Sequence, residues 1–192
     1  MTAVPDCACA VVVTVADASI PANSSAVVRL EVMESCSDPA PAQSLSAELL
    51  GLVNYLTPNE TELAILTGTQ PLALDRLQAG SLARRLLQRG ARNVIVKMGA
   101  QGALLVSEER QHYWPAVPVH AVDTTAAGDA FNAAFAVALA RGTTELEAGS
   151  YATAAAACSV TRPGAQPSMP TDEDAKVLLA TTSTEEYLKA VL

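Results

Sequence analysis

The sequence predicts an α/β sandwich with a mostly parallel sheet, for three reasons. Short apolar runs rich in β-branched residues alternate with longer amphipathic or alanine-rich runs, as strands and helices do in this fold class. Half of the residues are apolar and the mean hydropathy is +0.24, which is not the composition of a disordered chain. With 192 residues, the chain can form one domain that buries roughly 70% of its unfolded surface.

The charge of the chain argues against a nucleic-acid binder. The formal net charge is −8, and no cluster of Lys and Arg interleaves with aromatic residues. The densest basic group comprises Arg84, Arg85, Arg89 and Arg92, which we interpret as the solvated face of a helix. An acidic protein can still bind an anion where a cation and helix ends offset the repulsion.

Cysteine and histidine usage argues against a structural zinc site. The four cysteines form no C-x-x-C pair, and the chain has two histidines. We therefore expect reduced thiols and a cytoplasmic protein. The apolar run Cys7–Ala16 is too short to span a membrane. No Lys or Arg precedes Arg29, so the positive start of a signal peptide is missing.

The first 37 residues predict two short strands and offer no recognisable chemistry. Ala10–Val15 and Ala26–Val32 are β-branched runs separated by a loop of Pro, Asn and Ser. The first glycine of the chain is Gly51. After this region, Leu45–Val53 predicts a helix and Tyr55–Thr57 a short strand.

Asn59 and Glu62 open the next helix and allow two interpretations. Asn59 is a favourable N-cap, and Glu62 stands three residues later, as in a capping box. The helix continues through Leu66, and Gly68 ends it. Capping explains both polar residues without any function, and a role in ligand binding is the alternative.

The middle of the chain predicts a helix and two strands joined by a tight turn. Leu74–Arg89 has the pattern of an amphipathic helix. Asn93–Met98 and Ala103–Ser107 are apolar-biased strands, and the Gly99–Gly102 turn between them fits a β-hairpin or a strand-to-helix turn. His112-Tyr113-Trp114 follows, and we interpret it as a packed aromatic edge rather than a platform for a base.

The strongest functional signal lies between residues 116 and 142. An extended apolar run, Ala116–Val122, turns through Ala126, Ala127 and Gly128 into an alanine-rich helix, Asp129–Arg141. Small residues at such a turn let another group approach the backbone. The first N–H groups of a helix are unpaired and lie at its positive end, so an anion such as a phosphate is the natural occupant.

Asp129 begins this helix, and two explanations of it stay open. A carboxylate beside an anion site is explained if it takes a hydroxyl proton during phosphoryl transfer. It is equally explained if it only complements the helix dipole.

The end of the chain predicts a helix, a loop and a final helix. Glu145–Val160 is helical and contains the alanine run Ala154–Ala157, which can pack closely. Ser159–Ser168 is a loop rich in Pro and Gly. The last helix has Ser183 and Glu186 as a capping box.

The segment Asp123-Thr-Thr-Ala-Ala-Gly-Asp-Ala-Phe131 resembles the signature of the ribokinase-like (PfkB) carbohydrate kinases. Asp38-Pro-Ala-Pro-Ala42, Asn59-x-x-Glu62 and Gly164-Ala-Gln-Pro-Ser168 are similar to other motifs of that family. The resemblance runs from Asp38 to about Pro170 and, more loosely, to the end. It implies a three-layer α/β/α sandwich with the family's nucleotide-binding domain at 38–192 and an unmatched segment at 1–37.

The resemblance implies an ATP-dependent kinase that phosphorylates the primary hydroxyl of a small sugar such as D-ribose and releases ADP. Asp129 would be the catalytic base, and Ala127 and Gly128 would form the anion hole. Asn59 would lie near the phosphates, and Glu62 would act on Mg²⁺ through water, the functional alternative that we favour because Asp129 is also present. The nucleotide would be bordered by Lys97, Met98, Gly99, Ala100, Gln101, Gly102, Gly128 and Asp129, with Thr153 at the adenine.

The resemblance also implies a site for a monovalent cation, K⁺. Its ligands would come from Asp123 and Thr125 in the signature and from Ser159, Arg162, Gly164 and Ser168 in the later loop. Backbone carbonyl oxygens suit a weakly hydrated hard cation.

Part of the family pattern is not recognisable. The N-terminal half of the family supplies a Gly-Gly motif, a substrate Asp and a β-strand lid, and this chain has no Gly-Gly pair. Three interpretations follow: a sugar kinase, a module that binds ATP and cation without phosphorylating sugar, or a truncated form of an ordinary kinase. Whether the chain forms a homo-oligomer stays open. By resemblance, family dimers form through the lid, and the lid is not recognisable in this sequence. A dinucleotide-binding oxidoreductase is poorly supported, since no G-x-G-x-x-G follows a strand.

Overall fold

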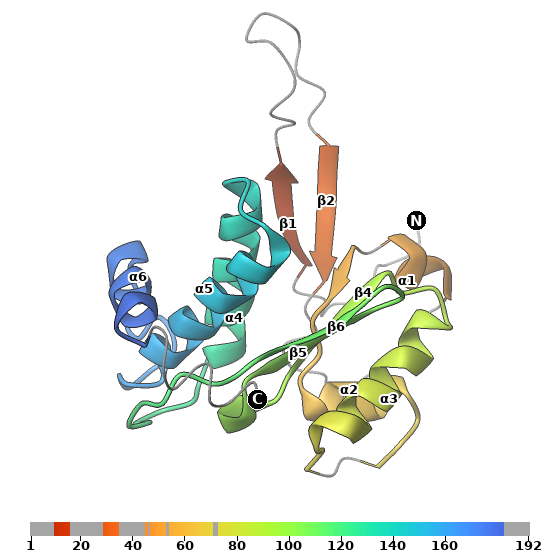
Figure 1. Ribbon diagram of the computed structural model, residues 1–192, viewed down its shortest axis with the longest axis horizontal. Coiled ribbons are helices and arrows are strands. Elements are labelled where there is room, and N and C mark those ends of the chain that lie inside the picture. The colour runs from red at the N-terminus through yellow and green to blue at the C-terminus, as the bar shows by residue number, and fades with distance from the viewer. Residues whose placement is uncertain are drawn as a thin grey trace, which may run out of the picture.

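The computed structural model describes residues 10–15, 29–34, 45, 47–52, 54–70 and 73–182. Within these ranges a six-stranded sheet carries helices on both faces (Figure 1). Helices α1 to α3 cover one face, α4 and α5 cover the other, and α6 packs against α5. The α/β class predicted from the sequence is therefore confirmed.

The strands are β1 (Ala10–Val15), β2 (Arg29–Glu34), β3 (Tyr55–Leu56), β4 (Asn93–Lys97), β5 (Ala103–Ser107) and β6 (Gln111–Trp114). Their order in the sheet is their order in the chain. Only β2, β3 and β4 run parallel, while β1 pairs antiparallel with β2, β5 with β4, and β6 with β5.

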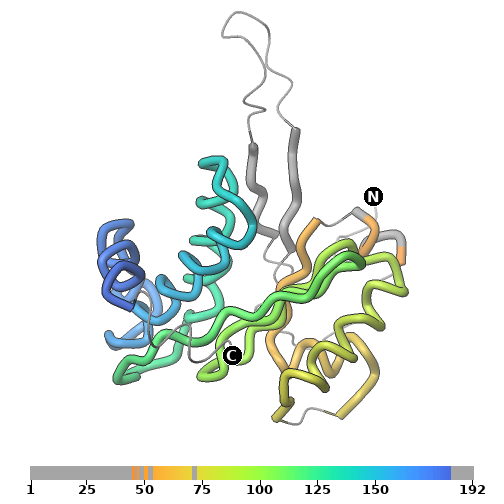
Figure 2. Tube along the Cα trace, in the orientation of Figure 1, coloured from red at the N-terminus to blue at the C-terminus, as the bar shows by residue number. Residues whose placement is uncertain are grey.

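The described sheet is thus mixed, and the prediction of a mostly parallel sheet is wrong for it. Figure 2 traces β4, β5 and β6 as three adjacent passes of the chain. The turns Gly99–Gly102 and 108–110 that join them are short. A parallel pair needs a crossover of a dozen residues or more, so turns of this length can only join antiparallel neighbours.

The helices are α1 (Ala47–Leu52), α2 (Glu60–Leu66), α3 (Arg76–Leu87), α4 (Ala127–Ala140), α5 (Glu145–Ser159) and α6 (Asp172–Thr181). A complete capping box begins α2, α3, α5 and α6. Helix α4 begins differently: its N-cap is Ala126, which offers no side-chain cap. Among the described residues, no helix is long and apolar enough to cross a membrane.

Two sequence predictions near these elements need correction. The extended run Ala116–Val122 is not a strand, because Pro115 and Pro118 have no N–H to give to a ladder. The strand that precedes this run, β6, ends at Trp114. Helix α6 was not predicted, although Thr171 and Asp174 form its capping box.

Two other predictions fall partly or wholly outside the described residues. The second N-terminal strand was predicted over Ala26–Val32; the structure describes it over Arg29–Glu34, and residues 26–28 lie outside the described residues. The capping box predicted at Ser183 and Glu186 lies outside the described residues.

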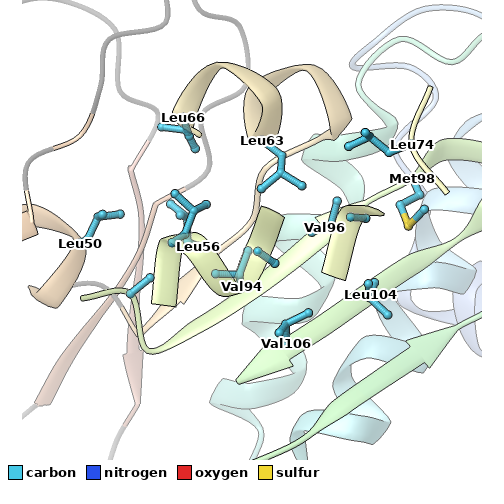
Figure 3. Close-up of a cluster of buried hydrophobic side chains, with 14 residues drawn as sticks. Leu50, Leu56, Leu63, Leu66, Leu74, Val94, Val96, Met98, Leu104 and Val106 are labelled. Atoms are coloured by element: carbon cyan, nitrogen blue, oxygen red, sulfur yellow. The ribbon is translucent and has the colours of Figure 1, made fainter. Parts of the chain in front are cut away.

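The core has one hydrophobic cluster on each side of the sheet. Figure 3 shows the cluster under α1 to α3, where Val94, Val96 and Leu104 meet Leu50 and Leu63. The cluster on the other side contains Ile95, Leu105 and Trp114 from the strands and Phe131 and Phe135 from α4. Successive residues of β4 therefore alternate between the two clusters, as the pleat of a strand requires.

Arg85 in α3 and Arg89 just after it do more than form a solvated face. Arg89 donates to the carbonyl oxygens of Leu66 and Leu45, at 2.6 and 2.7 Å, and Arg85 donates to that of Thr67 at 2.8 Å. The last carbonyls of a helix have no partner within it, so these guanidinium groups satisfy the C-terminal end of α2.

Replacing Arg89 by methionine is expected to lower the free energy of unfolding by about 1.5–3 kcal/mol, because hydrogen bonds from a charged group are lost while the packing stem remains. Urea denaturation measures the change. Arg84→Met is the matched control, since the Arg84 guanidinium donates to the exposed Gln111 side chain, at 3.0 Å, and not to a helix end. Equal losses of unfolding free energy in the two variants would contradict a stabilising role of the Arg89 hydrogen bonds.

Candidate functional site

A cavity of about 610 Å³ lies where β4 ends and α4 begins. Cavities of this size hold small organic ligands. Five segments line it, each in part: residues 59–61, 97–103, 116–121, 124–131 and 153–160. The fold therefore brings most of the predicted nucleotide-binding residues to one place.

Asn59 lies at the cavity because it pairs with the end of β4. The Lys97 N–H donates to the Pro58 carbonyl at 2.8 Å, and Asn59 forms a parallel bridge with Lys97. The Asn59 side-chain oxygen accepts the Glu62 N–H, and the Glu62 carboxylate accepts the Asn59 N–H, each at 2.8 Å. The predicted capping box is therefore present. Asn59 lines the cavity, whereas Glu62 is only 2% exposed and does not.

The turn after β4 places backbone, rather than long side chains, at the cavity. Gly99, Ala100 and Gly102 line it. Met98 does not, because it is buried in the cluster under α1 to α3. Gln101 does not either, since its side chain donates to the Leu74 carbonyl at 3.1 Å. We therefore leave Met98 and Gln101 out of the proposed site.

Gly102 also fixes the turn against β6. Its φ is 90°, a region that favours glycine. A Cβ on Gly102 would lie 2.1 Å from the carbonyl oxygen of Trp114. Only glycine allows the turn to pass this close to the neighbouring backbone, which keeps the cavity wall in place.

The start of α4 forms the wall opposite Asn59. Ala126 has a φ of 60°, and it is the one non-glycine residue with positive φ among the described residues. Ala127 and Gly128 line the cavity, and Asp129 is exposed in the first turn of the helix. The Ala127 N–H donates to the Thr124 carbonyl over a long 3.3 Å. An uncapped helix N-terminus thus faces the cavity, which is the arrangement that binds anions.

Helix α5 and the segment before α4 supply the apolar part of the cavity. Thr153 lines it and is held by a 2.8 Å hydrogen bond from its hydroxyl to the Gly149 carbonyl. Further lining residues were not predicted from the sequence: Glu60, Thr61, Ala103, Ala116, Val117, Pro118, Val119, Ala121, Thr124, Phe131, Ala156, Ala157 and Val160. Most of these side chains are small or apolar and carry no chemical signal; the alanine run 154–157 was the one available sign of close packing.

Asp123 joins the two segments of the predicted cation loop. One carboxylate oxygen accepts the Thr125 N–H at 2.9 Å and the other accepts the Gly164 N–H at 2.8 Å. Hydrogen bonds from Thr125, first its side chain and then its N–H, and from the N–H of Gly164 lower the pKa of Asp123 to about 2. The carboxylate is therefore charged at neutral pH.

The rest of this loop is fixed by its own hydrogen bonds. Ser159 and Ser168 are fully buried, and their hydroxyls donate to Ala156 and Ala165 carbonyls at 2.8 Å. The Arg162 guanidinium lies 3.2 Å from a carboxylate oxygen of Asp174. In the described part of the chain, no group of three or more His, Cys, Asp or Glu residues could hold a metal ion. The loop therefore offers a single carboxylate among backbone carbonyls.

The aromatic edge at His112–Trp114 is structural, as predicted. Trp114 is completely buried, and its ring N–H donates to the Leu146 carbonyl at 3.0 Å. The Tyr113 hydroxyl donates to the Gln101 carbonyl at 2.6 Å. None of the three aromatic side chains lines the cavity.

Comparison with known proteins places the chain beside sugar kinases. The sequence model of the pfkB family carbohydrate kinases matches residues 5–172, a range that begins upstream of Asp38. A ribokinase of Haemophilus influenzae is 42% identical over 137 residues, which cover 71% of this chain and 44% of the relative. A deoxyribokinase of Salmonella typhi is 40% identical with the same coverage.

The fold of the chain is also similar to that of a solved sugar kinase. Arabidopsis thaliana ribokinase, complexed with ribose and ATP, matches with a TM-score of 0.70 and 34% identity. The match covers 77% of this chain and 46% of that one. The chain thus spans about half the length of the relatives it matches.

Proposed function

The chain belongs to the pfkB family of carbohydrate kinases, and from this membership we propose that it forms the nucleotide side of an ATP-dependent kinase. The proposed reaction transfers the γ-phosphoryl group of ATP to the primary hydroxyl of a small sugar, converting D-ribose to D-ribose 5-phosphate. The observation that carries the proposal is the uncapped N-terminus of α4 in the wall of the cavity, with Asp129 in its first turn.

In the proposed chemistry, Asp129 takes the proton of the sugar hydroxyl as that oxygen bonds to the γ-phosphorus. The bond from phosphorus to the bridging oxygen breaks, and ADP leaves. N–H groups at the start of α4, around Ala127 and Gly128, stabilise the charge on the transferring group. Phosphoryl transfer depends mainly on such positioning and electrostatic stabilisation, and the helix end and Asp129 would supply part of both.

The cavity supports a nucleotide that extends from α5 to α4. Thr153 and the small side chains of α5 line the cavity together with the segment 116–119, and the proposed place of the base is between them. The backbone of Gly99, Ala100 and Gly102 and the amide of Asn59 border the path towards the phosphates. An apolar lining with a few placed polar groups is typical of such sites.

Mg²⁺ fits the donor set around the phosphates. The Asn59 amide offers a hard oxygen donor, and Glu62 lies behind Asn59, where it can act on the ion only through an intervening water. Mg²⁺ keeps several waters and binds substrate phosphates rather than an all-protein cage, so few protein ligands are needed. When bound, it would neutralise phosphate charge.

K⁺ fits the loop at Asp123, since a charged carboxylate there joins Thr125 and Gly164. The carbonyls of Ser159, Arg162 and Gly164 and the hydroxyl of Ser168 are the remaining proposed ligands. A cation there would fix the loop that enters α4 without touching the substrate.

K⁺ should therefore raise the melting temperature or the ATP affinity more than Na⁺ does at equal ionic strength, because an ion that binds only the folded state stabilises it. Thermal melts with and without ATP measure this. Asp123→Asn serves as the control and should abolish the difference between the two salts. Identical melting curves in both salts for the unaltered chain would count against the site.

A second candidate function is a module that binds ATP and a cation without phosphorylating sugar. The observation that favours it is the N-terminal sequence: the family's Gly-Gly sugar motif is absent, and the first glycine is Gly51. In-line positioning of the acceptor hydroxyl can lower the activation barrier by roughly 7–11 kcal/mol. A chain without the groups that position the sugar would therefore not phosphorylate it at a useful rate.

Two measurements test these proposals in turn. Isothermal titration of the purified chain with ATP and Mg²⁺ should show binding at one site, and absence of binding would overturn both candidate functions. A coupled assay with Mg²⁺ and K⁺ then compares D-ribose with 2-deoxy-D-ribose. Turnover of about 1–100 s⁻¹, which is normal for kinases, supports the sugar kinase and identifies its substrate. ATP binding without turnover on either sugar supports the second candidate.

A further inference from the structure

Lys97 is the last residue of β4, and the pleat of that strand sets the direction of its side chain. Val94 and Val96 belong to the cluster under α1 to α3, while Ile95 belongs to the cluster under α4 and α5. Side chains two residues apart in a strand lie on the same face. Lys97 therefore projects to the α4 side, at the end of the sheet where α4 begins.

The Lys97 side chain lies against the first turn of α4. Its Nζ atom is 3.2 Å, its Cε atom 3.8 Å and its Cδ atom 3.9 Å from the position that a Cβ on Gly128 would occupy. Gly128 does not have a positive φ, so its backbone conformation does not require glycine. A side chain at Gly128 would instead crowd the end of the lysine.

The same arrangement places the ammonium group in the cavity. Lys97 and Gly128 both line it, and so does Ala103, whose small side chain is the partner of Lys97 across the β4–β5 pair. Among the described lining residues, Lys97 is the only Lys or Arg, and Glu60 adds a negative charge. A polyanionic ligand at α4 therefore meets one full positive charge from the protein, beside the partial charge of the helix end.

We propose that the Lys97 ammonium group binds the terminal phosphate of the nucleotide at Gly128 and so makes the site selective for a triphosphate over a diphosphate. This rests on the proposed function, which places the transferring phosphoryl group at the start of α4. An ammonium group is a compact charge with three donors, so it can follow the phosphoryl oxygens as they move from ADP to the acceptor. Lys97 then touches the reacting group, whereas Gly128 positions the lysine.

The test compares the ATP and ADP affinities of Lys97→Met with those of the unaltered chain, by isothermal titration at a fixed Mg²⁺ concentration. Methionine keeps an unbranched stem and removes the charge. The ATP affinity should fall about 10- to 100-fold, which is the range for one hydrogen bond to a charged group, and the ADP affinity should fall much less. Lys176→Met is the matched control: Lys176 is exposed and pairs with Asp172 on α6, away from the cavity, so neither affinity should change.

A second variant separates charge from position. Gly128→Ala keeps Lys97 but puts a methyl group 3.2 Å from its Nζ, so the ammonium must move. We expect a smaller but measurable loss of ATP affinity and of the preference for ATP over ADP, with the melting temperature nearly unchanged.

Each remaining outcome overturns the inference. Equal losses of ATP and ADP affinity in Lys97→Met would mean that Lys97 contacts a phosphate that ATP and ADP share, and not the terminal phosphate of ATP. Unchanged ATP affinity would remove Lys97 from the site while leaving the proposed function intact. If the unaltered chain binds neither nucleotide, the proposed function and this inference fall together.

Discussion

Replacing Gly149 by alanine is expected to lower the free energy of unfolding by about 3 kcal/mol or more, the upper part of the range for overpacking a core. Gly149 lies in α5 directly over Trp114. A Cβ there would come within 2.1 Å of two atoms of the indole ring. The backbone fixes the position of the Cβ, so only a movement of the ring or of the helix could relieve this overlap. Trp114 cannot turn away cheaply, because it is fully buried and its N–H is bonded to Leu146.

The effect can be followed by fluorescence during urea denaturation, since Trp114 is the one tryptophan of the chain. Gly51→Ala is the matched control: Gly51 lies in α1 and has no atom within 4 Å of a new Cβ. Alanine is the better helix former, so that variant should be neutral or slightly more stable. A Gly149→Ala protein as stable as the unaltered chain would mean that α5 lies farther from β6 than the structure describes.

Replacing Asp129 by asparagine is expected to reduce phosphoryl transfer by about 10²–10⁴-fold and to leave ATP binding nearly intact, because a positioned base contributes about that factor. The change keeps the shape of the side chain and removes its ability to accept a full proton. The coupled assay with sugar, or ATP hydrolysis if water is the acceptor, measures transfer, and titration with ATP measures binding.

This variant also separates the two explanations of Asp129 that the sequence leaves open. If the carboxylate only complements the dipole of α4, stability should fall by about 0.3–1 kcal/mol and transfer should not change. Asp75→Asn is the control, because Asp75 caps α3 and asparagine caps a helix equally well. Transfer that is equally fast in both variants would remove Asp129 from the mechanism.

The sequence was a good guide where one local rule decides the structure. Asn59 and Glu62 form the capping box that their spacing predicts, and the alanine-rich helix predicted from Asp129 is present but already begins at Ala127. It was a poor guide where an apolar pattern hid a local strand breaker. The run 116–122 has the apolar residues of a strand, but Pro118 within it and Pro115 just before it have no N–H to give to a ladder.

The candidate site shows the same division. Ala127 and Gly128 of the signature line the cavity at the start of α4, and small residues at a helix start could be singled out from the sequence because they let another group approach the backbone. Met98 was included with its neighbours only by position in the chain, and the pleat turns it into the core. Ala156, Ala157 and Val160 line the cavity through packing alone, which no single-residue property indicates.

The meander of β4, β5 and β6 has a consequence for the order of folding. Its pairs join residues close in sequence, and hairpins of this kind close within roughly 1–10 μs. The bond between Asp123 and Gly164 instead spans 41 residues, so it carries a larger loop-closure entropy and forms later. We expect the meander to belong to the folding nucleus and the loop around α4 to close after the transition state. A ligand held by that loop would then slow unfolding and leave the folding rate almost unchanged.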